Sequence, residues 1–418
     1  MRFNCHSCLS GLSLILIIAA LPAAARSEES PVATWLQWRG PQRDSQVEGP
    51  AWPPALDAKH LEKVWSVPLG PSYSGPIVAA DRVFVTETVD KETEVVRALD
   101  RQSGKELWKV SWPGAINVPF FAKSNGDWIR STPAYDGERL YVAGIRDVLV
   151  CLNGADGEEI WRVDFSQATG AKLPAFGCVC SPLIDGDFVY IQAGAGLVKL
   201  DKYSGKIIWH SLRDGGGMYG SAFSSPVIRT INGRRQLLVQ TRKKLASVAL
   251  DSGEELWSQE IPAFRGMNIL TPTVIGNSVF TSSYGGGSYL YALNNGAATA
   301  EQRWRNKVQG YMSSPVVIDG HIYLHLRNKR FACINIETGQ EAWVTKPFGK
   351  YWSMVAQGDR ILALDERGDL LLIRANPQQF ELIDKRHISD EPTWAHLAVC
   401  GDQLFIRALN EQSMYRWK

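Results

Sequence analysis

A short pattern that ends in Gly and Trp returns along this 418-residue chain and constrains its fold more than any other feature. In its clearest copy, residues 98–108 run ALDRQSGKELW: a small residue, an apolar residue, Asp, turn residues, Gly and then Trp. Residues 199–209 and 333–343 repeat it. Looser copies end at Trp161, Trp257 and Trp304. Internal repeats with a period of about 20–50 residues are typical of solenoids, propellers and arrays.

Each repeat has the pattern of four short strands. In residues 313–344, the dipeptide Asp319-Gly320 favours a hairpin turn between a β-branched run and an alternating run. A second turn precedes the strand that carries the repeated Trp. The four strands of this repeat are expected at residues 313–318, 321–326, 331–335 and 341–344. Four antiparallel strands per repeat, arranged radially, form the blade of a β-propeller, so we predict an all-β fold.

The number of blades follows from the first strand of each repeat, where a small polar residue often precedes Pro. The eight starts lie near Pro76, Pro133, Pro182, Pro226, Pro272, Pro315, Trp352 and Trp394. The eighth start leaves room for three strands only, whereas residues 62–67 resemble an isolated fourth strand. We therefore predict eight blades, with the last blade closed by this N-terminal strand beside residues 414–416, which would remove two open sheet edges. Seven blades are the alternative, because the last two repeats are weak.

The repeated tryptophans have a structural interpretation. An indole ring can fill the gap between adjacent blades, and the preceding Gly allows a turn with positive φ. We expect this blade-packing role for Trp65, Trp108, Trp161, Trp209, Trp257, Trp304 and Trp343.

The repeat A-x-D-x-x-[ST]-G-x-x-x-W resembles the tryptophan-docking motif of the pyrroloquinoline quinone (PQQ) enzyme repeat. The resemblance covers about residues 62–418. It implies an eight-bladed propeller of the quinoprotein alcohol dehydrogenase-like superfamily. That superfamily holds dehydrogenases, the propeller of the outer-membrane barrel-assembly machinery and secreted bacterial propellers. The segment Trp35–Asp44 is similar to one that precedes the propeller in the secreted, non-enzymatic branch, to which we assign the chain.

The resemblance also implies which residues an active quinoprotein would need. Such enzymes use an adjacent Cys-Cys disulfide and bind Ca²⁺ through carboxylate and amide oxygens. This chain has no adjacent Cys pair, and Cys178 and Cys180 are separated by one residue. Asp127, Asn117 and Asn268 lie near blade ends, but no acidic set converges. We therefore expect no catalytic residue, no metal and no cofactor, with PQQ and calcium required only under the alternative of a PQQ-dependent oxidoreductase.

The N-terminus has the pattern of a secretory signal. Arg2 precedes an apolar run at residues 12–21, and Ala23–Ala25 form a small-residue cleavage site. We predict a signal peptide at residues 1–25, a leader segment at 26–61 and the propeller at 62–418, and hence a periplasmic or secreted monomer. An uncleaved anchor is the alternative. Beyond residue 25 the 44 basic and 43 acidic residues nearly balance, which gives no indication of nucleic-acid binding.

Two sets of loops are expected at one end of the propeller, here called the top face. The loops into the first strands carry aromatic residues, and Tyr311, Trp352 and Trp394 are expected at the channel mouth. The hairpins between second and third strands carry basic residues: Arg146, Arg242, Lys243, Lys244, Arg327, Lys329 and Arg367. Arg and aromatic residues together are typical of interface hot spots. In the alternative interpretation the turns are only solvated, and acids such as Asp147 and Asp365 dilute the basic signal.

Three functional hypotheses follow. The first is a non-enzymatic envelope scaffold that binds a protein or an envelope polymer on the top face. The second is the quinoprotein oxidoreductase. The third is an outer-membrane protein assembly factor, which the absence of a lipid-attachment Cys after the apolar run disfavours.

Overall fold

The computed structural model describes residues 32–294, 296 and 298–418. The chain divides into two units, residues 1–32 and 33–418, and the description below concerns the second. The expected signal peptide at residues 1–25 lies outside the described residues. Within the described part of the chain, no helix has the length and apolar character needed to cross a membrane.

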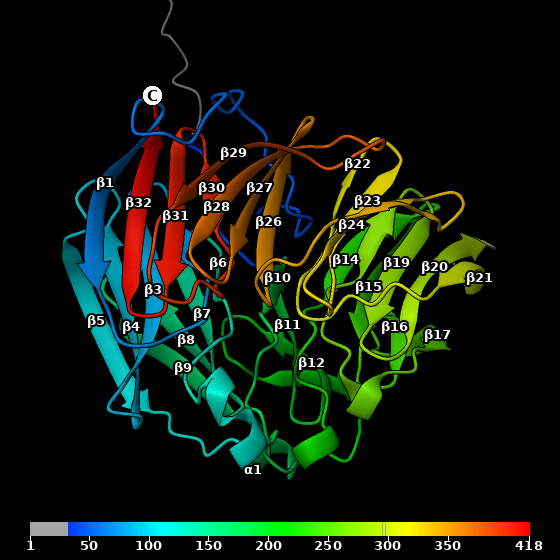
Figure 1. The fold of residues 1–418 in the computed structure, drawn as a ribbon. Helices are drawn as coiled ribbons and strands as arrows, with labels where there is room; N and C mark the ends of the chain where they lie inside the picture. Colours follow the sequence, from blue (N-terminus) through cyan, green and yellow to red (C-terminus); the bar gives the residue numbers. More distant parts are fainter. Residues whose placement is uncertain (1–31, 295, 297) are drawn as a thin grey trace, which may run out of the picture. The chain divides into compact units, whose positions relative to one another are not determined.

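Residues 33–418 form eight four-stranded antiparallel blades, as predicted (Figure 1). The first four blades consist of β2(Ile77–Val78), β3(Arg82–Val89), β4(Thr93–Asp100), β5(Glu106–Pro113); β6(Ala134–Tyr135), β7(Arg139–Gly144), β8(Val148–Asn153), β9(Glu159–Asp164); β10(Leu183–Asp185), β11(Phe188–Ala193), β12(Gly196–Asp201), β13(Ile207–Ser211); and β14(Val227–Ile231), β15(Arg234–Gln240), β16(Lys244–Val248), β17(Glu255–Glu260). The next three consist of β18(Thr273–Ile275), β19(Ser278–Ser283), β20(Gly287–Asn294), β21(Thr299–Asn306); β22(Val316–Ile318), β23(His321–His325), β24(Phe331–Asn335), β25(Glu341–Val344); and β26(Trp352–Gln357), β27(Arg360–Asp365), β28(Asp369–Arg374), β29(Glu381–His387).

The eighth blade joins the two ends of the propeller. Its inner strands are β30(Ala398–Cys400), β31(Gln403–Ala408) and β32(Glu411–Trp417), and its outermost strand is β1(Leu61–Pro68). The register pairs Trp65 with Met414 and Ser66 with Ser413, and a bulge lies between Lys63 and Trp65. The predicted closure by the N-terminal strand is confirmed, and the alternative of seven blades is wrong.

In six of the eight blades, the Trp of the Gly-Trp pattern donates a hydrogen bond to the next blade. Trp161 on β9 donates from Nε1 to the carbonyl of Lys202 in blade three at 3.0 Å. Its ring covers Gly205, which has a φ of +72°, and a Cβ there would lie 2.6 Å from Trp161 Cε3. Trp257 departs from the pattern and donates to Gln236 Oε1 at 3.0 Å. The common indole bond to the next blade joins Trp65 to Arg101, Trp108 to Gly154, Trp209 to Leu250, Trp304 to Ile336 and Trp343 to Asn376.

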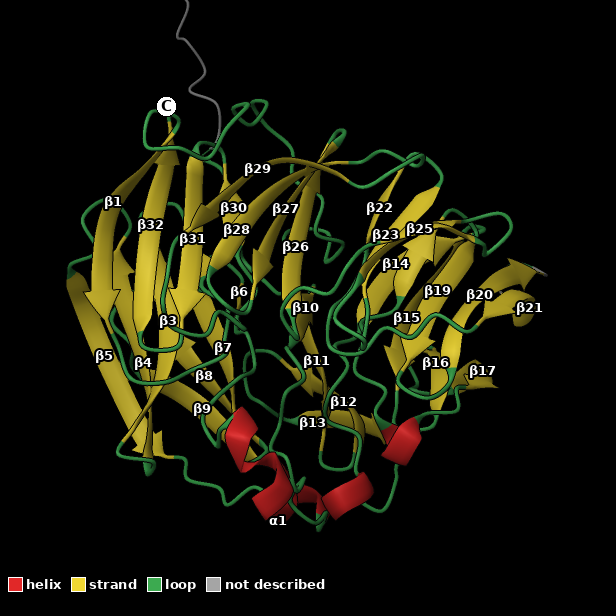
Figure 2. Cartoon of the chain, in the orientation of Figure 1, coloured by secondary structure: helices red, strands yellow, loops and turns green. Residues whose placement is uncertain are grey.

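Four short helices lie in successive crossings from one blade to the next. They are η1(Phe120–Asn125), α1(Phe165–Thr169), η2(Gly217–Tyr219) and η3(Phe264–Gly266). Figure 2 shows them gathered at one end of the propeller. Because these crossings and the hairpins between second and third strands lie at the same end of the blades, the helices mark the top face.

Candidate functional site

The leader segment before β1 occupies the central channel. Trp35 forms a β-bridge with Val78 on β2, and Gln46 forms one with Ala356 on β26. Trp38 donates from Nε1 to Thr271 Oγ1 at 3.1 Å, and its ring contacts the His396 imidazole edge-on at 5.0 Å. The leader therefore contacts blades on several sides of the channel and closes it below the top face.

Two arginines anchor this leader. Arg39 and Arg43 are only 1% and 2% exposed. Arg39 Nη2 donates to the carbonyl of Pro315 at 2.5 Å, and Arg43 donates from Nη1 to Pro182 at 2.9 Å and from Nη2 to Ser181 at 3.1 Å. Burial lowers the pKa of Arg39 to about 10 and that of Arg43 to about 9. Backbone carbonyls of blades three and six thus solvate both cations, which explains the arginines of the leader motif.

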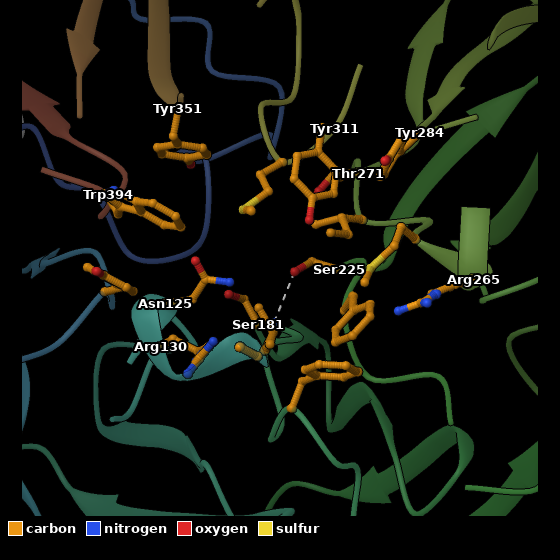
Figure 3. Close-up of a pocket in the computed structure, with 18 of the residues that line it drawn as sticks. Asn125, Arg130, Ser181, Ser225, Arg265, Thr271, Tyr284, Tyr311, Tyr351 and Trp394 are labelled. Carbon is orange, nitrogen blue, oxygen red and sulfur yellow. Dashed lines mark hydrogen bonds between the residues drawn. The ribbon is translucent and has the colours of Figure 1, made fainter. Parts of the chain in front are cut away.

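A pocket with a volume of about 350 Å³ lies among the loops of the top face, and Trp38 of the leader lines it. Figure 3 shows its wall, with Tyr311, Tyr351 and Trp394 among the labelled side chains. Crossings between successive blades supply most of its wall. Ten of its lining residues are aromatic: Trp38, Tyr73, Phe121, Phe176, Phe223, Phe264, Tyr284, Tyr311, Tyr351 and Trp394. Pockets of this volume with mainly aromatic walls and a few polar groups are typical of ligand sites.

The aromatic side chains contact one another in sequence around the pocket. On one side, Trp394 stacks between Tyr73 and Tyr351, with ring centroids 4.9 and 5.9 Å apart. On another side, Tyr284 lies between Phe264 and Tyr311, at 5.0 and 5.4 Å. A third group joins Phe121, Phe176 and Phe223. The aromatic side chains of the pocket therefore come from nine different loops and the leader.

The polar groups of the pocket are donors rather than acidic acceptors. Arg130 and Arg265 line it, whereas none of its lining residues is Asp or Glu. Arg130 donates from Nη2 to the carbonyl of Gly126 at 2.7 Å and from Nε to that of Trp128 at 3.3 Å. Burial lowers the pKa of Arg130 to about 10. Arg265 stacks over Phe264 at 5.2 Å. The local charge is consequently positive.

Large apolar side chains surround the pocket on the helices of the top face. Phe120 on η1 is 83% exposed, Tyr219 on η2 is 63% exposed and Phe264 on η3 is 49% exposed. Phe121 and Met218 are their exposed neighbours. We call these five residues the apolar rim. A lone aromatic residue in a loop does not reveal in the sequence that a short helix will expose it.

Two of the three aromatic residues expected at the channel mouth line the pocket, and the third does not. Tyr311 and Trp394 are in its wall. Trp352 is fully buried, stacks on His325 at 5.1 Å and donates from Nε1 to Asp365 Oδ2 at 2.9 Å. The expectation that Trp352 contacts a partner is corrected: it is the first residue of β26, and its side chain packs into the core of the sixth and seventh blades.

The expected basic residues divide into three groups. Arg242 is 4% exposed and holds neighbouring loops, because it stacks on Phe223 at 4.7 Å and donates to the carbonyl of Arg265 at 2.6 Å. Lys244 pairs with Glu255 on the adjacent strand. The remaining residues are exposed in the hairpins of the top face: Arg146, Lys243, Arg327, Lys329 and Arg367.

Arg327 is an exposed basic hairpin residue that contacts the pocket wall. Its guanidinium lies over the ring of Tyr284 at 4.0 Å and donates to the Tyr284 hydroxyl at 2.9 Å. Arg367 pairs with Asp365, and Arg146 donates to the carbonyl of Ala115. Exposed basic groups therefore lie on hairpins of the same face as the apolar rim.

The acids that weakened the basic signal in the sequence are buried. Asp147 is 1% exposed and accepts from the backbone N–H of Gly194 at 2.9 Å. Asp365 is fully buried and accepts from the N–H of Gly349 at 2.6 Å. Asp147 therefore ties its hairpin to the hairpin of the next blade, and Asp365 ties its hairpin to the crossing that precedes β26.

The pocket does not match the calcium and quinone site that the resemblance implies for the enzymes. Its wall has no carboxylate and no cysteine. Cys178 and Cys180 are buried free thiols, and only the intervening Val179 lines the pocket. In the described part of the chain, no group of three or more His, Cys, Asp or Glu is placed to hold a metal ion.

These features define a binding propeller: eight blades, a channel closed by the leader, and an aromatic pocket inside an apolar rim. The sequence pattern of the family described as "Outer membrane protein assembly factor BamB" matches residues 91–345, and the chain belongs to this family.

Relatives with that description share about a quarter of their residues with this chain. The protein from Yersinia pestis is 23% identical over 304 residues, which cover 67% of this chain and 70% of the relative. The protein from Escherichia coli K12 is 24% identical over 305 residues, which cover 67% and 69%.

Solved structures show the same fold. BamB from Moraxella catarrhalis has a TM-score of 0.62 at 17% identity, covering 86% of this chain and 98% of that one. The quinohemoprotein alcohol dehydrogenase from Comamonas testosteroni has a TM-score of 0.67 at 11% identity, covering 92% and 80%.

Proposed function

We propose that this protein is a periplasmic scaffold in the assembly of outer-membrane proteins and that it binds a partner protein through the apolar rim of its top face. Membership of the BamB family supports a role in outer-membrane protein assembly, which was the third of the three hypotheses from the sequence. The expected signal peptide at residues 1–25 supports a periplasmic location.

The exposed apolar rim is the observation that carries the proposal. Phe120 and Tyr219, on two crossings of the top face, expose more than half of their surface to solvent. Large exposed apolar groups beside arginines are typical of protein interfaces, where aromatic residues and Arg supply most of the affinity. The exposed basic hairpins, Arg327 among them, would steer an acidic partner toward the rim and thereby raise the association rate.

The experiment compares two pairs of substitutions in cells that lack the endogenous protein. Phe120→Ser with Tyr219→Ser removes apolar surface from the rim. Ile160→Ser with Ile208→Ser removes apolar surface from the outermost strands β9 and β13, where these side chains are 42% and 45% exposed. Neither pair lines the pocket, so the comparison isolates the rim.

The amount of outer-membrane protein in the envelope is the readout. We expect cells without the protein to contain less, the Ile160 and Ile208 pair to restore the normal amount, and the Phe120 and Tyr219 pair to fail. Normal amounts in the cells that lack the protein would contradict the assembly role. Full restoration by the rim pair would contradict the assignment of the surface.

A further inference from the structure

The pocket inside the rim has the features of a ligand site in its own right. It is a recess of about 350 Å³, and Phe121 and Phe264 of the apolar rim form part of its wall. Trp38 of the leader lies in its wall together with residues of all eight crossings between blades. The question is therefore which chemical group this recess accepts.

Its aromatic walls favour a flat ring. The stack of Tyr73, Trp394 and Tyr351 presents one aromatic wall, and Tyr284 with Tyr311 presents another (Figure 3). Aromatic side chains attract further rings through offset-stacked and edge-to-face contacts. Burial raises the pKa of the Tyr73 hydroxyl to about 12, so this group remains a neutral hydrogen-bond donor.

Arg130 supplies a specific polar anchor. Its Nε and Nη2 atoms are held by backbone carbonyls of the loop at residues 126–128, and Nη1 has no hydrogen-bond acceptor among the described residues. The negative charge of Asp127 raises the pKa of Arg130, but this effect is smaller than the lowering by burial. An Arg guanidinium fixed in this way is suited to bind a carboxylate, and its burial strengthens the interaction.

The neighbouring groups agree with an anionic ligand. Asn125 lies beside Arg130 in the wall and offers an amide donor (Figure 3). Arg265 adds a second guanidinium from another crossing. Because the wall contains no Asp or Glu, nothing within the pocket neutralises this positive charge or repels an anion.

We propose that this pocket binds a small ligand, or the end of a chain, that combines an aromatic ring with a carboxylate, and that Arg130 receives the carboxylate while the aromatic side chains enclose the ring. The proposal concerns a site that the scaffold function does not require. Binding measurements with the purified protein test it.

The test is isothermal titration calorimetry with four related probes. Phenylacetate represents a free aromatic acid, and N-acetyl-L-phenylalanine represents a chain end with its carboxylate. N-acetyl-L-phenylalanine amide lacks the charge, and cyclohexylacetate lacks the aromatic ring. We expect one or both aromatic acids to bind at least tenfold more tightly than the matched amide and cyclohexyl probes, since a charge-assisted hydrogen bond and ring stacking are both lost. Tighter binding of phenylacetate indicates a free acid, and tighter binding of the acetylated amino acid indicates a chain end. No binding, or equal binding of the amide, would overturn the proposal.

Substitution of Arg130 provides a second test of the proposal. Arg130→Gln should reduce the preference for N-acetyl-L-phenylalanine over its amide to less than threefold, whereas Arg130→Lys should retain part of it. Arg303→Gln on β21 is the matched control, because Arg303 is exposed and pairs with Glu337 far from the pocket. Retention of the full preference by a folded Arg130→Gln protein would overturn the assignment of Arg130. If that variant does not fold, the wild-type probe series decides the proposal.

Discussion

Replacing Trp65 by Ala tests how strongly the N-terminal strand closes the propeller. Trp65 is 8% exposed, donates from Nε1 to the carbonyl of Arg101 at 3.1 Å and contacts the ring of Phe405 at 6.1 Å. Its ring also covers Gly104, where a Cβ would lie 2.8 Å from Trp65 Cδ2. The side chain therefore packs between blade eight and blade one, and its contact with Phe405 adds to the pairing of β1 with β32 that joins the two ends of the propeller.

The expected cost follows from the buried area. A Trp side chain buries about 150–250 Å², which at roughly 25 cal/mol per Å² gives about 4–6 kcal/mol. Residual burial in the unfolded chain lowers such values by about 10–40%. We therefore expect Trp65→Ala to lower the free energy of unfolding by about 3–5 kcal/mol, within the range of other large core truncations.

Equilibrium urea denaturation followed by tryptophan fluorescence measures this cost. Val64→Ala is the matched control, because Val64 lies on the same strand with 38% of its surface exposed and should cost less than about 1 kcal/mol. Trp65→Phe should fall between the two, since it keeps part of the apolar contact and loses the indole hydrogen bond. Equal stability of the Trp65→Ala and Val64→Ala proteins would refute closure by this contact.

Three further outcomes are expected. Gly205→Ala should destabilise the protein by about 1–3 kcal/mol more than Gly186→Ala in thermal unfolding, because both glycines have positive φ but only the first has Trp161 against it, and equal costs would contradict the docking contact. Burial raises the folded-state pKa of Glu94 to about 7 from an ordinary value of 4.5, so folding favours the protonated carboxyl. This group therefore stabilises the protein by on the order of 3 kcal/mol below pH 4.5, and the stabilisation is lost as the pH rises to 7. Urea denaturation at pH 5 and pH 8 should therefore show a smaller decline for Glu94→Gln than for the wild type, and identical declines would contradict this. Finally, we expect no dye-linked oxidation of alcohols or sugars after incubation with PQQ and calcium; turnover that chelation abolishes would favour the oxidoreductase hypothesis.

The blades could be predicted because their determinants are local. A Gly-Trp pair places both the turn and the docking ring of a blade within a few residues, so each repeat carries its own signal even where relatives are dissimilar. The closing strand was predictable for a similar reason: the eighth repeat lacked a strand, and residues 62–67 had the corresponding pattern without a partner.

The site was less predictable because its contacts join residues far apart in the sequence. Arg43 donates a hydrogen bond to the carbonyl of Pro182, and Trp38 donates one to Thr271. Because these partners are more than 100 residues away in the sequence, no local pattern predicts that the leader lies in the channel. Trp352 and Asp365 resemble an exposed aromatic residue and a solvated hairpin acid, yet they are hydrogen-bonded to each other in the core.

The most direct test of the account is site-specific photo-crosslinking in the intact envelope. A benzoylphenylalanine would replace Tyr219 on the rim or, in a second protein, Ile208 on the outermost strand β13, two apolar positions that are 63% and 45% exposed. We expect the probe at position 219 to give one discrete adduct with a protein of the outer-membrane assembly apparatus and the probe at position 208 to give none. Adducts at position 208 alone, or no adduct at position 219 in functional protein, would contradict partner binding on the top face.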